Sequence, residues 1–131
     1  MNLTVYSKNR LRGTFALWDV PADFADPMYN YLVYGYQPGS FFSYVLANNF
    51  AKAILSSHPG NTIEALKHLV GWMRDTLPEE TWGSYTKVDE WCDMPAAMRR
   101  PILEKQGLVY TEKEEVWMAL KDTPTQEPIL Y

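Results

Sequence analysis

Cysteine and histidine are scarce in this sequence, and their scarcity argues against several kinds of site. Cys92 is the only cysteine among 131 residues, so the chain cannot form an internal disulfide or a cysteine-based zinc site. The two histidines, His58 and His68, lack the HExxH spacing of zinc proteases, and the chain has no acidic calcium-binding loop. We therefore predict no cofactor, no metal ion and no catalytic residues, with Cys92 packed as a small apolar side chain.

The sequence also lacks an excess of positive charge. With 12 Lys and Arg residues against 16 Asp and Glu residues, the net charge is −4 and the pI is about 5.1. The best nucleic-acid candidates, Arg99 and Arg100, open a stretch with helix-turn-helix rhythm, but its second helix would begin with glutamates, which DNA phosphates repel. We predict no direct binding of nucleic acid. Because the N-terminus has no apolar run of signal-peptide length, we expect a cytoplasmic protein.

One long block, residues 27–51, contains no charged side chain and five tyrosines. Its length would suit a membrane span, but Gly35, Pro38 and Gly39 interrupt it, and polar residues are scattered through it. We therefore predict two helices joined by a turn. Asp26 would cap the first helix, with Pro27 at its first position and Gly35 at its end.

Capping residues and helical spacing of apolar residues recur along the rest of the chain. The predicted helices span residues 27–34, 40–54 with a kink or restart at Asn48 and Asn49, 62–77, about 84–92 after Ser84 or Thr86, 95–107 with an interruption or restart at Pro101, and 111–120. The fold class is thus mainly α, a compact single-domain bundle of about five to six short helices covering residues 1–122. Apolar and polar residues alternate loosely over residues 1–20, and we predict a β-hairpin or an arm there. Residues 123–131 form an extended or disordered tail.

Aromatic residues are the unusual excess, at 15% of the chain. Two amphipathic helices cannot bury all the tyrosines of the uncharged block, so we expect some of them to face a partner. Nearby, an acidic loop with Trp82 suggests a partner with a basic or aromatic-accepting surface. The predicted partner-binding residues are Tyr34, Tyr36, Glu79, Glu80, Trp82, Asp89 and Glu90.

Part of the sequence follows a recognisable pattern. It runs from "YLVYGYQPGSFF" through "YVLANNF" and an Asn-led helix with "LVGWM" to "TWGS" and "VDEW", over residues 31–91. This pattern resembles a group of small proteins encoded by phages, prophages and plasmids, although Asn49 stands where the group has Asp and the C-terminal extension is long. The resemblance implies a mobile-element origin and no catalytic residues.

These observations lead to one expected function and two alternatives. We expect an accessory protein of a phage or mobile element, which acts in the cytoplasm of the host cell. It would bind a host protein and inhibit or redirect it, for example as an anti-CRISPR-like inhibitor of host defence. One alternative is a homo-oligomeric structural or assembly factor. The other is a small enzyme that uses Glu79, Glu80, His68 or Cys92, which would require these side chains to converge in one cleft.

Overall fold

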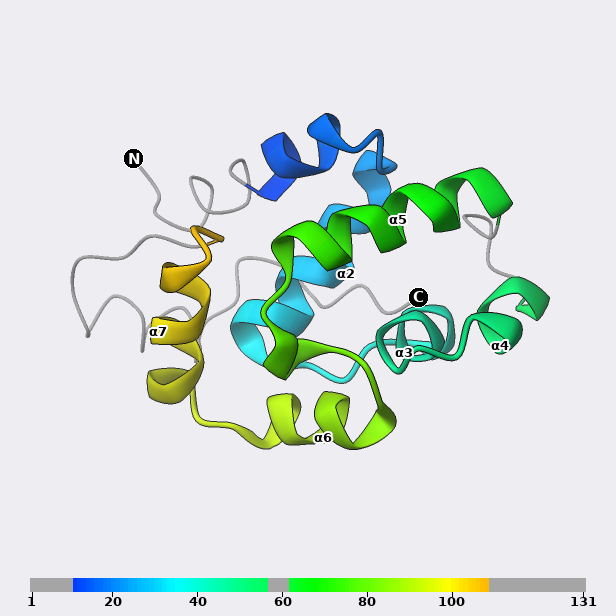
Figure 1. Cartoon of the computed structure of the whole chain (residues 1–131). Coiled ribbons are helices and arrows are strands. Elements are labelled where there is room, and N and C mark those ends of the chain that lie inside the picture. The colour runs from blue at the N-terminus through cyan, green and yellow to red at the C-terminus, as the bar shows by residue number, and fades with distance from the viewer. Residues whose placement is uncertain (1–10, 57–61, 109–131) are drawn as a thin grey trace.

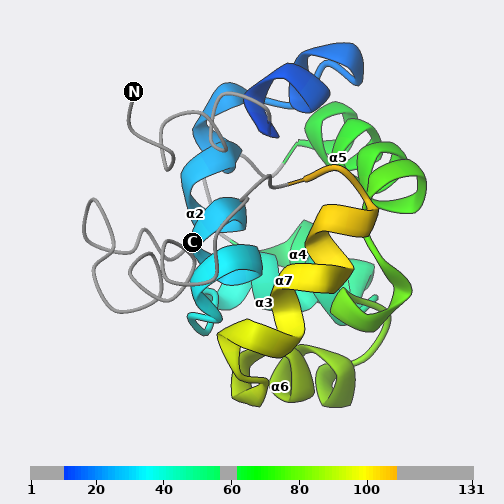
Figure 2. The same cartoon turned by 90° about the vertical axis from the view of Figure 1, so that its left-hand side faces the viewer.

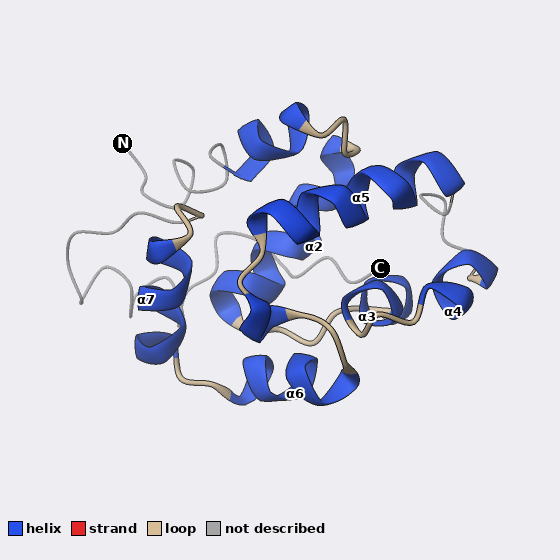
Figure 3. Cartoon of the chain, in the orientation of Figure 1, coloured by secondary structure: helices blue, strands red, loops and turns tan. Residues whose placement is uncertain are grey.

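A computed structural model of the chain describes residues 11–56 and 62–108, and 74% of these residues are helical. No strand occurs among them (Figure 3). The predicted mainly α fold is confirmed, with seven helices in the described part against the predicted five to six. The elements are a helix at residues 11–17, the 3₁₀ turn η1 (Ala22–Phe24), α2 (Ala25–Tyr29), the π-helical turn η2 (Asn30–Tyr34), α3 (Ser40–Leu46), α4 (Phe50–Leu55), α5 (Ile63–Thr76), the 3₁₀ turn η3 (Glu79–Thr81), α6 (Tyr85–Asp93) and α7 (Ala96–Lys105).

A single continuous helix, formed by η1, α2 and η2, lies in the middle of the molecule. The other helices surround it, with η2 in contact with both α6 and α7 (Figures 1 and 2). Between Phe24 and Tyr34 every side chain except Asp26 is buried. A helix that is apolar on all sides belongs in the core, which explains the absence of charge in this part of the sequence.

The predicted start of this helix was wrong by five residues. The helix begins at Ala22, after Pro21, so Asp26 does not cap it and instead pairs with Arg12, at 3.3 Å. Pro27 lies in the first turn of α2 rather than at the first helical position. The predicted end is confirmed, since Gly35 ends η2 with φ of 70°.

The predicted N-terminal hairpin is corrected by the structure. Its first strand lies outside the described residues, whereas residues 11–17, which reach into its second strand, are helical. Leu11 and Phe15, four residues apart, are both buried, and the Phe15 ring packs edge-on against Trp72 with centroids 4.6 Å apart. The Trp72 indole also donates a hydrogen bond to the Thr14 hydroxyl, at 3.0 Å. Packing on α5 therefore favours a helix for residues 11–17 over the strand that their loosely alternating sequence suggested.

Between α3 and α4 the chain stops one helix and starts another. Asn48 has a left-handed φ of 65°, and the N–H of Asn49 bonds to the carbonyl of Tyr44, which closes α3. The Asn49 side chain then caps α4 by accepting from the N–H of Lys52, at 3.3 Å. Of the two predicted alternatives, kink or restart, the structure shows the restart.

Local signals place the later helices well. Thr62 caps α5 through its hydroxyl and Ser84 caps α6, as predicted for the latter. By contrast, α7 continues through Pro101 without a break and ends at Lys105, two residues before Gly107, which has φ of 71°. The cap of α5 was expected at Asn61 and is instead Thr62. The helix at 111–120 and the tail at 123–131 lie outside the described residues. Within residues 11–56 and 62–108, none of the helices has the length and apolar character required to cross a bilayer.

Candidate partner-binding surface

The tyrosines of the uncharged block lie mainly in the core. Tyr29, Tyr31 and Tyr34 are 1%, 1% and 6% exposed, and Tyr36 is half-buried. The Tyr34 ring lies between those of Tyr29 and Tyr36, with centroid distances of 5.9 and 5.6 Å. Tyr34 is therefore a core residue, which corrects the expectation that it faces outward. The expectation assumed that this helix buries one face, whereas neighbours cover it on every side.

Side chains from α6 and α7 bind the C-terminal carbonyls of the central helix. The Trp91 indole N–H donates to the carbonyls of Tyr31 and Leu32, both at 3.2 Å. Arg99 is 1% exposed and donates through Nε and Nη2 to the carbonyl of Val33, at 3.3 and 3.1 Å. These bonds add donors to the last carbonyls of the helix, where backbone partners run out, although the Tyr31 carbonyl also accepts from the N–H of Gly35, at 3.1 Å. The role of Arg99 is thus structural, and its guanidinium is unavailable to nucleic acid.

Cys92 is half-buried, and its thiol lies 3.7 Å from the carbonyl oxygen of Tyr36. Burial, reinforced by the negative charge of Asp89, raises the pKa of Cys92 to about 11, although Arg99 acts in the opposite direction. The thiol is consequently protonated at neutral pH. A reactive cysteine requires the opposite shift, because the thiolate is the nucleophile.

The side chains required by the small-enzyme alternative are dispersed. His68 lies in a groove of about 290 Å³ with Asp19 and Glu64, and its Nδ1 is 3.2 Å from the Asp19 carbonyl. Cys92 packs beside Tyr36, and the Glu79–Glu80 pair lines a different groove. The structure does not bring together the side chains that this alternative requires.

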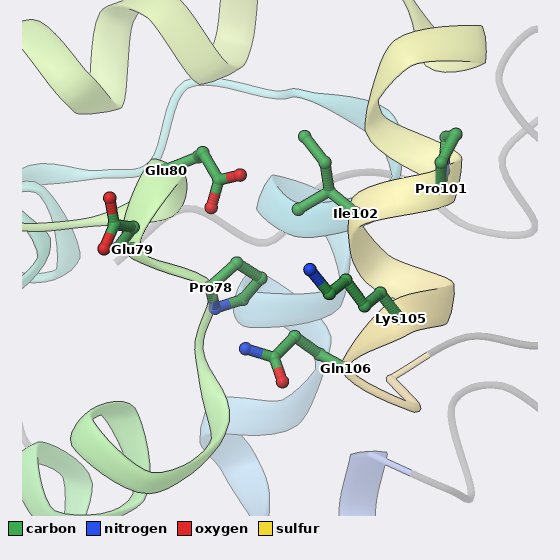
Figure 4. A pocket seen from close by; sticks show the side chains of 7 residues that line it. All are labelled: Pro78, Glu79, Glu80, Pro101, Ile102, Lys105 and Gln106. Atoms are coloured by element: carbon green, nitrogen blue, oxygen red, sulfur yellow. The ribbon is translucent and has the colours of Figure 1, made fainter.

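The predicted acidic residues Glu79 and Glu80 lie on η3 and are both exposed. They lie beside a groove of about 630 Å³ between η3 and α7, lined by Pro78, Glu79, Glu80, Pro101, Ile102, Lys105 and Gln106. The Glu80 side chain points toward α7, whereas that of Glu79 points away from it (Figure 4). The sequence contained a signal for the acidic wall only. The opposite wall comes from residues more than 20 positions later, and no local pattern predicts that they meet.

The remaining predicted residues lie on or beside α6. Trp82 is half-buried against the core, so little of its ring is available to a partner. Asp89 and Glu90 are exposed and lie about 100° apart around the helix. Asp89 accepts a hydrogen bond from the Gln37 amide, at 3.4 Å, next to Tyr36. The structure thus divides the predicted surface into the η3–α7 groove and the edge of α6.

The carboxylates of the groove are not neutralised by the nearest base. Lys87 donates to the backbone carbonyl of Glu79, at 3.0 Å, and not to a carboxylate. Within the described part of the chain, ion pairs join Arg12 to Asp26 and Arg100 to Glu104, and neither involves the groove. The negative charge of η3 therefore faces solvent.

Comparison with known proteins adds no relative. No family model matches this chain. No curated protein and no solved structure matches it either. Among residues 11–56 and 62–108, no three or more His, Cys, Asp and Glu side chains gather as a metal site would require.

Proposed function

We propose that this protein is a non-enzymatic binding protein that docks a basic surface of a partner protein on the groove between η3 and α7. The observation that carries this proposal is the pair of exposed carboxylates on η3, Glu79 and Glu80, which no cation of the described chain neutralises. The setting we propose is the one that the sequence pattern implies. The partner would be a host protein that a phage or mobile-element accessory protein inhibits or redirects, such as a component of host defence.

The backbone that carries the two glutamates is held rigidly, which supports a binding role. Thr81 is fully buried, its carbonyl accepts from the Tyr31 hydroxyl at 2.6 Å, and its own hydroxyl donates to Pro78 at 2.7 Å. The N–H of Gly83 bonds to the carbonyl of Leu46 on α3, at 2.7 Å. A partner that binds here does not have to order this loop, so less affinity is lost to conformational entropy.

Charge supports a basic partner. The net charge of −4 favours encounter with a positively charged surface, and unpaired carboxylates reject an acidic one. Contact residues of opposite charge set the rate of association and its salt dependence. Association with the partner should therefore slow as the ionic strength rises.

The test is affinity capture of the tagged protein from host-cell lysate, with mass spectrometry of the bound proteins. The Glu79→Gln/Glu80→Gln double variant removes both groove charges. A matched control, Asp23→Asn/Glu64→Gln, removes two exposed charges elsewhere. A stoichiometric partner that the control retains and the groove variant loses is the expected result. A partner retained equally by both variants would contradict the proposed surface.

One observation favours the homo-oligomeric alternative. Leu55 and Ile63, at the ends of α4 and α5, are 84% and 76% exposed, and Ile54 beside them is 46% exposed. Large apolar side chains with this much exposure are candidates for an interface. Light scattering coupled to size-exclusion chromatography distinguishes self-assembly from binding to a host protein. A dimer or larger assembly that Leu55→Ser returns to monomer would favour self-assembly.

A further inference from the structure

The η3–α7 groove has two chemically different walls. Glu79 and Glu80 lie on the η3 side, and Lys105 with Gln106 lies on the α7 side. Pro78 beside η3, and Pro101 and Ile102 on α7, add apolar surface to the two walls. Figure 4 shows the side chains of Glu80, Ile102 and Lys105 directed into the space between the two elements.

The two charged walls face each other without closing the groove. Neither Glu79 nor Glu80 forms an ion pair with Lys105 in the described structure, where a pair would require an N–O distance of 4 Å or less. Opposite charges held apart across an open groove can bind a ligand whose own charged and polar groups are arranged to complement the two walls. Such a ligand places a cation against η3 and hydrogen-bond acceptors against α7.

An extended peptide has these features. Its side chains supply the cation and an apolar group, and its carbonyls accept from the Lys105 ammonium and the Gln106 amide. The groove volume of about 630 Å³ lies within the roughly 300–1,000 Å³ typical of ligand sites. We infer that the groove binds an extended segment of the partner protein in which an arginine or lysine side chain meets Glu79 and Glu80, and a neighbouring apolar side chain packs on Ile102. This inference rests on the proposed function.

The experiment titrates the full-length, ¹⁵N-labelled protein with a synthetic peptide of alternating arginine and leucine, blocked at both ends. The control peptide replaces each arginine by citrulline, which has nearly the same shape but no charge. We expect the amide resonances of residues 79–80 and 102–106 to shift with the arginine peptide. The citrulline peptide should bind at least about tenfold more weakly, since a lost charge-assisted hydrogen bond is worth about 1.4 kcal/mol or more.

Two variants test the walls separately. Glu80→Gln should weaken the arginine peptide about tenfold, while Asp23→Asn leaves its affinity unchanged. Ile102→Ala should weaken both peptides alike, because it removes apolar contact and no charge. The ¹⁵N spectrum of each variant shows whether the fold is intact.

Several results would overturn the inference. These are no binding at millimolar peptide, equal affinity for the citrulline peptide, or shifts confined to other surfaces. The chain's own tail is a rival occupant, and a peptide of residues 123–131 that shifts the same resonances would assign the groove to the tail. The proposed function fails separately. If lysate capture depends on Glu79 and Glu80 while peptides do not bind, the partner docks as a folded surface and only the present inference is lost.

Discussion

Substitution of Gly35 by alanine tests the central feature of the fold, the junction where the core helix ends against α7. Gly35 has φ of 70°, and an added Cβ would lie 2.8 Å from Nη1 and 3.0 Å from Cζ of Arg99. It would also lie 3.2 Å from the backbone oxygen of Cys92. Arg99 cannot yield easily, because its guanidinium donates to the carbonyls of Val33 and Met94.

The magnitude follows from two terms. The left-handed conformation costs an alanine about 1–2 kcal/mol, and part of this is offset because alanine restricts the unfolded chain. Overpacking against the buried guanidinium costs about 1–3 kcal/mol more. We therefore expect Gly35→Ala to lower the free energy of unfolding by about 2–4 kcal/mol, or the melting temperature by roughly 10 °C.

Urea unfolding followed by tryptophan fluorescence measures this change. Gly13→Ala is the matched control, because Gly13 is helical and exposed and an added Cβ would meet nothing within 4 Å. It should stabilise the protein by about 0.5–1 kcal/mol. In an Arg99→Ala background the overpacking against the guanidinium should vanish, and Gly35→Ala should then cost less, with only the backbone term and the 3.2 Å contact with the Cys92 oxygen remaining. An equal cost in both backgrounds would refute the reasoning that Arg99 is fixed against Gly35.

Three further predictions concern buried polar groups. Asn30 is 1% exposed and its side-chain amide has no hydrogen-bond partner. Asn30→Leu should therefore be neutral or stabilising in urea unfolding, and a loss of more than about 2 kcal/mol in the free energy of unfolding would reveal a hidden partner. Trp91→Phe leaves the carbonyls of Tyr31 and Leu32 without their indole donor and should cost about 3 kcal/mol by the same assay, whereas a loss below about 1 kcal/mol would contradict this role. Burial raises the pKa of Cys92 from 9.0 to about 11, so the folded state holds the thiol proton more tightly than the unfolded state. Stability should therefore fall between pH 9 and pH 11, and it should fall less in Cys92→Ala, while identical pH profiles would count against the burial.

The acidic half of the candidate site was predictable from the sequence, whereas the groove was not. Glu79 and Glu80 stand out because acids cluster around them and few bases lie nearby. Lys105 and Ile102 join them only because α7 folds back toward η3, a contact between segments more than 20 residues apart. Tyr34 was placed wrongly for a related reason, since the sequence does not show how many neighbours surround a helix.

The sequence by itself determined the mainly helical class and many helix ends, because the signals for these act within four or five residues. Ser84 caps α6 through its own third neighbour, and Gly35 ends the core helix through its own backbone conformation. Only the tertiary structure decided that residues 11–17 are helical and that Arg99 is buried. Packing on Trp72 favours the helix at residues 11–17, and the carbonyl of Val33, 66 residues away in the chain, binds the Arg99 guanidinium. Such contacts depend on which segments meet in space, and the local sequence does not predict these long-range contacts.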